Sequence, residues 1–133
     1  MKTVLFICIG NSGRSQMAEA FFEPISVGWN TLSAGIRPDK RIHPLTIAVM
    51  KSVGIDISER KPKPLTNKML RDAELIIAMD SHVLSTIPRT YLPKTRNWRI
   101  SGLLGKQPEQ VREIRDQIRR KVEQLSRELS SQP

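Results

Sequence analysis

The chain has 133 residues, of which 38% are hydrophobic and 26% charged, and its formal net charge is +9. This composition predicts one globular domain over residues 1–133 and excludes a disordered chain. No apolar run approaches the ~20 residues that a membrane-spanning helix needs, so we expect no membrane partner. The single cysteine and the absence of a cleavage site after the apolar start predict a cytoplasmic protein.

The positive charge has two interpretations. It is typical of a surface that attracts anions, nucleic acid included, or of a solvated basic surface with no such partner. The basic residues are spread along the chain, without interleaved aromatic residues and without the spacing of zinc ligands. We therefore expect no nucleic-acid partner, no metal and no other cofactor.

The first elements of the chain predict an anion site. The apolar run Val4–Ile7 is typical of a buried parallel strand, and it ends at Cys8. Residues 9–13 are rich in Gly, Asn and Ser, as in a tight turn, and a helical pattern runs from Arg14 until Pro24 stops it. Cys8 therefore lies at the end of a strand, in a loop whose N–H groups lead into a helix N-terminus.

The rest of the chain alternates strand and helix patterns. Strands are predicted at 31–34, 74–79 and 97–100, longer helices from Pro44 and Pro108, and short helices from Asn67 and Ser81, with 87–94 irregular. The helix at Pro44 has an apolar stripe of Leu45, Ala48, Val49 and Val53, and the last helix has one from Val111 to Leu129.

This order of elements predicts an α/β fold, a three-layer sandwich with a central four-stranded parallel sheet. In such sheets the ligand lies beyond the carboxyl ends of the strands. Cys8, Gly35, Asp80 and the loop 101–105 all follow predicted strands, so we expect them to converge on one rim.

The loop from Cys8 to Arg14 has the composition of an oxyanion site. A loop this short turns successive N–H groups inward, and Arg14 adds a planar fork for two oxygens. The same charge and dipoles favour the thiolate of Cys8, which is the nucleophilic form. Ser15 is placed to hydrogen-bond this thiolate, and Asn11 to hold the loop in an unusual conformation. The alternative, an inert core cysteine, does not explain why the strand, Gly10, Ser15 and the helix coincide.

The run CIGNSGRSQMAEAFF resembles the low-molecular-weight protein tyrosine phosphatases and their relatives, the thioredoxin-coupled arsenate reductases. SAG, HPLTIAVMKSVGIDIS, IIAMD and a reductase-type last helix extend the resemblance over nearly the whole chain. It implies the low-molecular-weight phosphatase fold, Cys8 as nucleophile, Arg14 as oxyanion ligand, a phosphocysteine or arsenocysteine intermediate, and Asp80 as a supporting residue beside Asn11 and Ser15. It also implies phosphate binding by Ile9, Gly10, Asn11, Ser12, Gly13, Arg14 and Ser15.

The chain departs from the family pattern in its cysteines. Gly13 stands where the phosphatases often have a second cysteine, which removes a redox guard for Cys8. The two further cysteines that the reductases use for a disulfide relay are absent, and Ala78–Asp80 is the phosphatase-like version of that segment. A disulfide relay within the chain is therefore excluded.

The chain also lacks the general acid of the family. No Asp-Pro pair occurs in the sequence, and Ser101–Leu104 occupies its place. General acid catalysis is worth roughly 10²–10⁴-fold, so its loss predicts very slow attack on alkyl phosphates. Three other residues near the rim each have a structural explanation. Asp80 supports the loop, His82 starts a helix, and His43 precedes the helix-starting Pro44.

The sequence therefore predicts a cysteine-dependent phosphatase that acts on aryl phosphate or phosphotyrosine, in a small substrate or a phosphoprotein, and that is weakened by the missing acid. Two alternatives stay open. One is an arsenate reductase that uses an external thiol, and the other is a non-catalytic protein that binds phosphate or another oxyanion.

Overall fold

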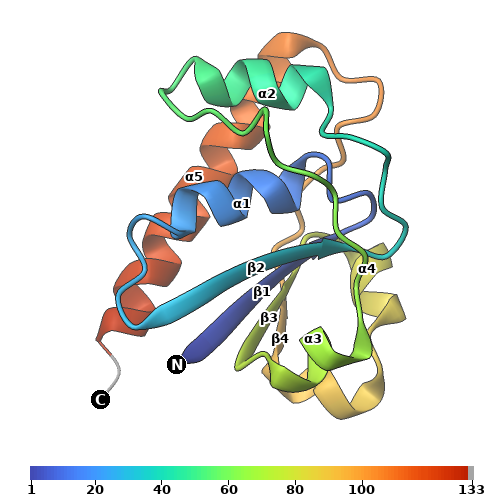
Figure 1. Ribbon diagram of the computed structural model, residues 1–133, viewed down its shortest axis with the longest axis vertical. Helices are drawn as coiled ribbons and strands as arrows, with labels where there is room; N and C mark the ends of the chain where they lie inside the picture. Colours follow the sequence, from blue (N-terminus) through green and yellow to red (C-terminus); the bar gives the residue numbers. More distant parts are fainter. Residues whose placement is uncertain (132–133) are drawn as a thin grey trace.

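The computed structural model describes residues 1–131, which form a four-stranded parallel sheet in the order β2-β1-β3-β4 with helices on both faces (Figure 1). The predicted α/β sandwich is confirmed. The strands are β1 (Lys2–Cys8), β2 (Trp29–Gly35), β3 (Leu75–Ala78) and β4 (Thr95–Asn97). The helices are α1 (Arg14–Phe22), α2 (Pro44–Lys51), α3 (Asn67–Asp72), α4 (Ser81–Thr86) and α5 (Pro108–Ser130), together with a 3₁₀ helix, η1 (Arg89–Lys94).

The central strand β1 is apolar from Val4 to Cys8 because both of its faces are covered there. Val4, Phe6 and Cys8 belong to the core that α1, α2 and α5 close, whereas Leu5 and Ile7 belong to the core under α3 and α4. Alternate residues of a strand point to opposite faces, so a two-sided core requires a continuous apolar run. The same alternation places Cys8 on the side of the long helices.

Helix α1 is enclosed between the sheet and α5, and all nine of its residues are buried (Figure 1). The stripe predicted for α5 is confirmed, since Val111, Leu129 and the four apolar residues between them are buried. No helix within residues 1–131 combines the length and the apolar character needed to cross a membrane.

The strand predicted at 97–100 was wrong in position. β4 ends at Asn97, and Arg99 has a φ of 53°, which takes the backbone out of the strand conformation. Trp98 and Ile100 are buried all the same, because their side chains join the core around Phe6. These two positions are therefore apolar because they are buried residues of a loop, and they do not mark a strand.

Two smaller predictions also need correction. Residues 89–94, expected to be irregular, form η1. The stripe of α2 was wrong at Ala48, which is exposed, because the buried face consists of Thr46, Val49 and Met50. These positions have the i, i+3, i+4 spacing of one helix face. Thr46 therefore lies on the buried face of the helix, where the sequence pattern predicted Ala48.

Candidate active site

The loop between β1 and α1, Cys8–Arg14, is called the oxyanion loop below. Its carbonyl groups at positions 8, 9, 10 and 12 accept hydrogen bonds of 2.9–3.2 Å from N–H groups in the segment 36–43 that follows β2. A trans peptide directs its C=O and N–H to opposite sides, and residues 1–131 contain no cis peptide. The N–H groups that follow these carbonyls are therefore directed to the inner side of the loop, as an anion site requires.

Glycine at position 35 lets the end of β2 approach the oxyanion loop. A Cβ atom there would lie 2.8 Å from the carbonyl oxygen of Ile9 and 2.9 Å from the nitrogen of Asn11. Both are backbone atoms, so they cannot rotate away. Gly35 therefore sets how closely the segment after β2 holds the loop.

Cys8 lies at the base of an open cavity of about 380 Å³ and is only 3% exposed. The backbone N–H of Asn11 donates to its Sγ at 3.2 Å, and the Oγ of Ser15 lies 2.8 Å from the same sulfur. These two contacts fix the position of the sulfur atom against the cavity.

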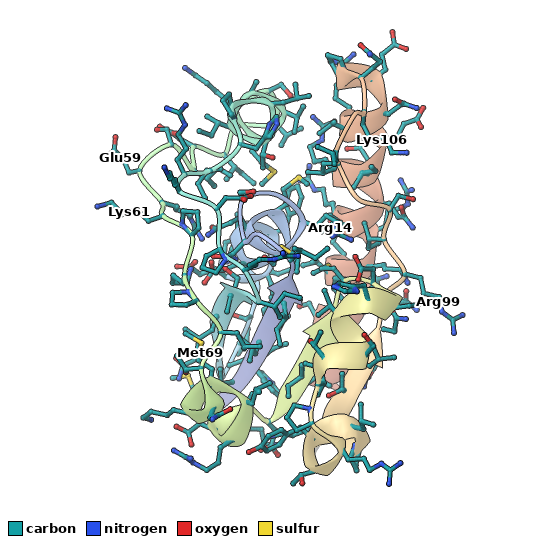
Figure 2. The ribbon with its side chains drawn as sticks, turned by 90° about the vertical axis from the view of Figure 1, so that its right-hand side faces the viewer. Arg14, Glu59, Lys61, Met69, Arg99 and Lys106 are labelled. Atoms are coloured by element: carbon teal, nitrogen blue, oxygen red, sulfur yellow. The ribbon has the colours of Figure 1, made fainter. Side chains whose placement is uncertain are left out.

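Arg14 is buried beyond the carboxyl ends of the strands (Figure 2). Its Nη1 donates to Oδ2 of Asp80 at 2.8 Å and to the carbonyl oxygen of Ile100 at 2.8 Å. These bonds orient the guanidinium group, which also lines the cavity above Cys8. A planar fork fixed in this way is suited to hold two oxygens of a tetrahedral anion.

Asp80 supports both Arg14 and α4. Its Oδ1 accepts a 2.8 Å hydrogen bond from the N–H of Val83, which caps the helix. Burial acts to raise the pKa of Asp80, but the hydrogen bonds from Val83 and Arg14 outweigh it and hold the pKa below its ordinary value. The carboxylate is therefore charged near neutrality, which suits the supporting role expected of it.

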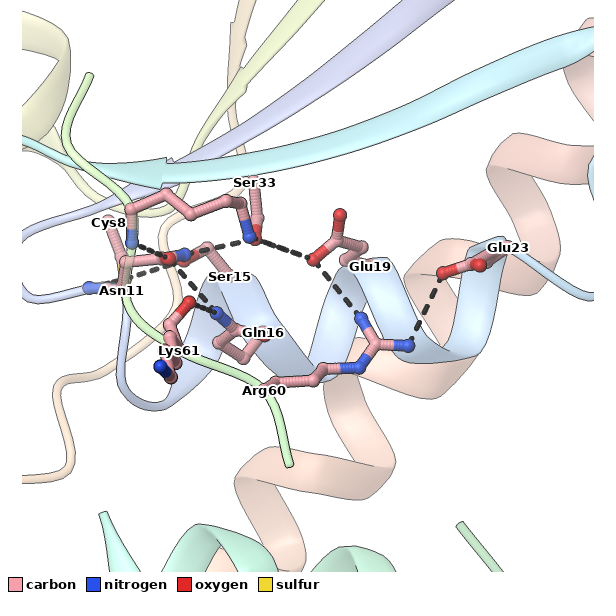
Figure 3. Close-up of polar contacts among 10 residues, drawn as sticks. Cys8, Asn11, Ser15, Gln16, Glu19, Glu23, Ser33, Arg60 and Lys61 are labelled. Carbon is pink, nitrogen blue, oxygen red and sulfur yellow. Dashed lines mark hydrogen bonds and ion pairs between the residues drawn. The ribbon is translucent and has the colours of Figure 1, made fainter. Parts of the chain in front are cut away.

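Asn11 is held in a left-handed conformation, with a φ of 51°, by four side-chain hydrogen bonds (Figure 3). Its Nδ2 donates to the hydroxyl groups of Ser15 at 2.7 Å and Ser33 at 3.0 Å. Its Oδ1 accepts from Gln16 at 3.0 Å and from the N–H of Lys63 at 2.8 Å. This strained residue is thus fixed from α1, β2 and the segment before α3.

A buried carboxylate extends the same network. Oε1 of Glu19 accepts from Ser33 at 2.7 Å and pairs with Arg60 at 3.2 Å and Lys63 at 3.5 Å (Figure 3). A buried charge is costly unless it is paired and hydrogen-bonded, and both conditions hold here. Glu19, Arg60 and Lys63 were not predicted from the sequence; the available signal was an acid among the apolar residues 17–22 of α1.

The family model for low molecular weight phosphotyrosine protein phosphatases matches residues 3–133. The chain belongs to this family. An arsenate reductase of Brevibacillus brevis is 35% identical over 127 residues, 94% of each chain. A glutaredoxin arsenate reductase of Synechocystis is 32% identical over 131 residues, which are 98% of this chain and all of the relative.

Solved structures have the same fold. A mutant of YwlE from Bacillus subtilis has a TM-score of 0.88 at 22% identity. The match covers 98% of this chain and 100% of the YwlE chain. An arsenate reductase in a phosphate-binding state has a TM-score of 0.84 at 32% identity, with 96% of this chain and 98% of its own covered. The predicted membership of the phosphatase and arsenate reductase superfamily is confirmed.

The structure gathers most of the predicted phosphate ligands around the cavity. Cys8, Ile9, Gly10, Ser12, Gly13 and Arg14 line it, whereas Asn11 and Ser15 are fully buried and are not among its lining residues. His43 lines the cavity while its Nδ1 accepts from the N–H of Leu45 at 3.2 Å. His82 is exposed and is not among the residues that line this cavity. Among residues 1–131, no three His, Cys, Asp or Glu side chains are grouped to hold a metal ion.

An apolar segment stands where the family has its acid. The side chain of Leu103 packs over Gly13, so that a Cβ atom on this glycine would lie 2.5 Å from Cδ1 of Leu103. Leu104, 99% exposed, also lines the cavity. This wall offers a proton donor only in Lys106, and the carboxylate of the cavity lies elsewhere, on Asp39 of the segment after β2.

Proposed function

We propose that this protein is an arsenate reductase that forms a covalent adduct on Cys8 and takes its electrons from an external thiol. The observation that carries the proposal is the similarity to arsenate reductases over nearly the whole chain, at 35% identity for the Brevibacillus relative. The site supplies what the first step needs, namely a thiol beside hydrogen-bond donors and a fixed guanidinium group over the same cavity.

The reaction begins when arsenate binds to the N–H groups of the oxyanion loop and to Arg14. The thiolate of Cys8 attacks arsenic; an S–As bond forms, and one As–O bond breaks as its oxygen takes a proton and leaves as water. An external thiolate then attacks Sγ of Cys8. An S–S bond forms and the electron pair of the S–As bond passes to arsenic. Arsenic is thereby reduced from As(V) to As(III) and leaves as arsenite. A second thiol resolves the mixed disulfide and restores Cys8.

An external reductant is required because Cys8 is the only cysteine of the chain. The name of the Synechocystis relative includes glutaredoxin, a thiol protein, which supports a reductant of this class. Attack by an external thiolate needs no general base, whereas attack by water on the covalent adduct does. Arsenate reduction is therefore less affected than hydrolysis by the loss of the family's acid–base residue. Such a reductant also fits the predicted cytoplasmic location.

Hydrolysis of aryl phosphates is the second candidate, and the apolar side chains around the cavity favour it. Leu45, Leu103 and Leu104 line the cavity beside the oxyanion loop, so an aromatic ring attached to a bound phosphate would pack against them. Cys8 would then form a phosphocysteine that water hydrolyses. The family's description as phosphotyrosine phosphatases supports the same reaction.

Two assays on one preparation separate these candidates. Arsenite formation from arsenate is measured with and without glutathione, glutaredoxin or thioredoxin, and hydrolysis is measured with an aryl phosphate that has an acidic phenol. We expect thiol-dependent arsenite from the native protein and none from Cys8→Ala. If arsenate only competes with the aryl phosphate, the second candidate stands. Phosphate binding without either activity would leave an oxyanion-binding protein.

A further inference from the structure

Asp39 places a carboxylate directly over the oxyanion loop. Its backbone N–H donates to the carbonyl oxygen of Gly10 at 2.9 Å, and its Oδ2 accepts a 2.5 Å hydrogen bond from the hydroxyl of Ser12. A Cβ atom on Gly10 would collide with this carboxyl group. The backbone bond and the Ser12 hydroxyl therefore hold the carboxyl group against one end of the loop, in space that the glycine leaves free.

Asp39 is the one carboxylate among the residues that line the cavity above Cys8. The other titratable groups on the cavity wall are Cys8, Arg14, His43 and Lys106. Lys40 and Arg41 of the same segment line a neighbouring hollow together with Asp39. None of the ion pairs formed by residues 1–131 includes Asp39, so its partner at the cavity is the Ser12 hydroxyl.

A charged carboxylate at this place would repel the anion that the loop is built to bind. A proton shared in a hydrogen bond between the carboxyl group and the bound oxyanion removes this repulsion. A carboxyl group that holds such a proton beside the bound substrate can pass it to a leaving oxygen.

We infer that Asp39 is a catalytic residue that protonates the leaving oxygen, from the segment after β2 and not from the segment 101–104 that stands in the place of the family's acid. Leu103 covers the Gly13 end of the oxyanion loop, and Asp39 covers the Gly10 end. The inference rests on the proposed covalent chemistry of Cys8. It concerns a step that arsenate and phosphate esters share, namely departure of an oxygen from the central atom.

With an aryl phosphate, Asp39 gives a proton in the first step and takes one back in the second. The thiolate of Cys8 forms the S–P bond while the P–O bond to the aryl group breaks. The proton of Asp39 passes to the leaving oxygen, which departs as a neutral phenol. The carboxylate then takes a proton from the water that attacks phosphorus, the S–P bond breaks, and Cys8 returns to the thiolate. With arsenate, the same proton allows the oxygen to leave as water.

The test compares native protein with Asp39→Asn on a series of aryl phosphates, from those of acidic nitrophenols to phenyl phosphate. The amide oxygen of asparagine can still accept from Ser12, so the variant keeps this hydrogen bond and removes the transferable proton together with the negative charge. We expect less than about 3-fold loss of kcat/KM on the most acidic phenol and on the order of 10²-fold loss on phenyl phosphate. The fall of kcat on the alkaline side, which reports the enzyme–substrate complex, should also disappear in the variant for phenyl phosphate.

Glu59→Gln is the matched control, because it removes one exposed carboxylate remote from the site and changes the net charge equally. Asp39→Glu keeps an acid and should lose less on phenyl phosphate than Asp39→Asn does. An equal loss of kcat/KM by Asp39→Asn on every ester, or a gain, would overturn the inference and leave Cys8 chemistry intact. Native protein that forms no adduct with any ester would overturn both.

Discussion

Gly35→Ala tests how the oxyanion loop is held. The new Cβ would lie 2.8–2.9 Å from three backbone atoms of residues 9–11, whereas such contacts ordinarily begin near 3.4 Å. The loop must therefore move by about 0.5 Å, since backbone atoms cannot rotate aside. Overpacking of this kind costs about 1–3 kcal/mol, against roughly 0.4–1 kcal/mol gained because alanine restricts the unfolded chain. We expect a net loss of about 1–2 kcal/mol.

The displacement should also reach the chemistry. A misplacement of roughly 1 Å costs on the order of 10²-fold in rate, so half of it predicts about a 10-fold loss of turnover and weaker phosphate binding. Urea denaturation and phosphate titration measure both effects. Gly102→Ala is the control for stability, because a Cβ atom there meets nothing within 4 Å, so only the gain from the restricted unfolded chain remains and the unfolding midpoint should rise slightly. Native stability and phosphate affinity in Gly35→Ala would refute this account of the loop.

Three further predictions concern the supports of the loop. Asp80→Asn should lower the free energy of unfolding at pH 7. Because folding lowers the pKa of Asp80, the stabilisation by its carboxylate is present above about pH 4 and is lost as the pH falls through the lowered pKa, so the two unfolding midpoints should converge on acidification. Gly13→Ala should weaken phosphate affinity only slightly, since the clash is with the end of the Leu103 side chain, which can rotate aside, and adding Leu103→Ala should remove that loss in the same titration. Lys63→Ala should destabilise the protein by about 1–2 kcal/mol in urea and Lys61→Ala hardly at all, because the ammonium group of Lys63 pairs with the buried Glu19 beside Arg60 and that of Lys61 does not.

The oxyanion loop was predictable from the sequence because its information is local. An apolar strand, a turn composition and a helix start follow one another without a break from Val4 to Phe22, and each is specified by neighbouring residues. The stripe of α5 was predictable for the same reason. The end of the strand predicted at 97–100 was not predictable, because the apolar residues Trp98 and Ile100 are buried in the core that contains Phe6, which is far away in sequence.

Asp39 could not be placed from the sequence because its position depends on a long-range contact. It lies in a polar loop beside Pro38, where an aspartate is ordinary. Asp39 is brought to the cavity by the backbone hydrogen bonds that hold the segment 36–43 along the oxyanion loop. Glycine at position 10 leaves room there for its carboxyl group. The available signal was its place shortly after the carboxyl end of β2, on the rim where ligands of parallel sheets bind.

The most direct test of covalent chemistry at Cys8 is mass spectrometry of the protein quenched during turnover of an activated aryl phosphate. A covalent step predicts one added phosphoryl group, located on the peptide that contains Cys8 and absent from Cys8→Ala. Cys8→Ala is preferred to Cys8→Ser, because a serine at this place is itself a possible phosphoryl acceptor. A phosphoryl group on any other residue, or turnover that survives in Cys8→Ala, would contradict the mechanism.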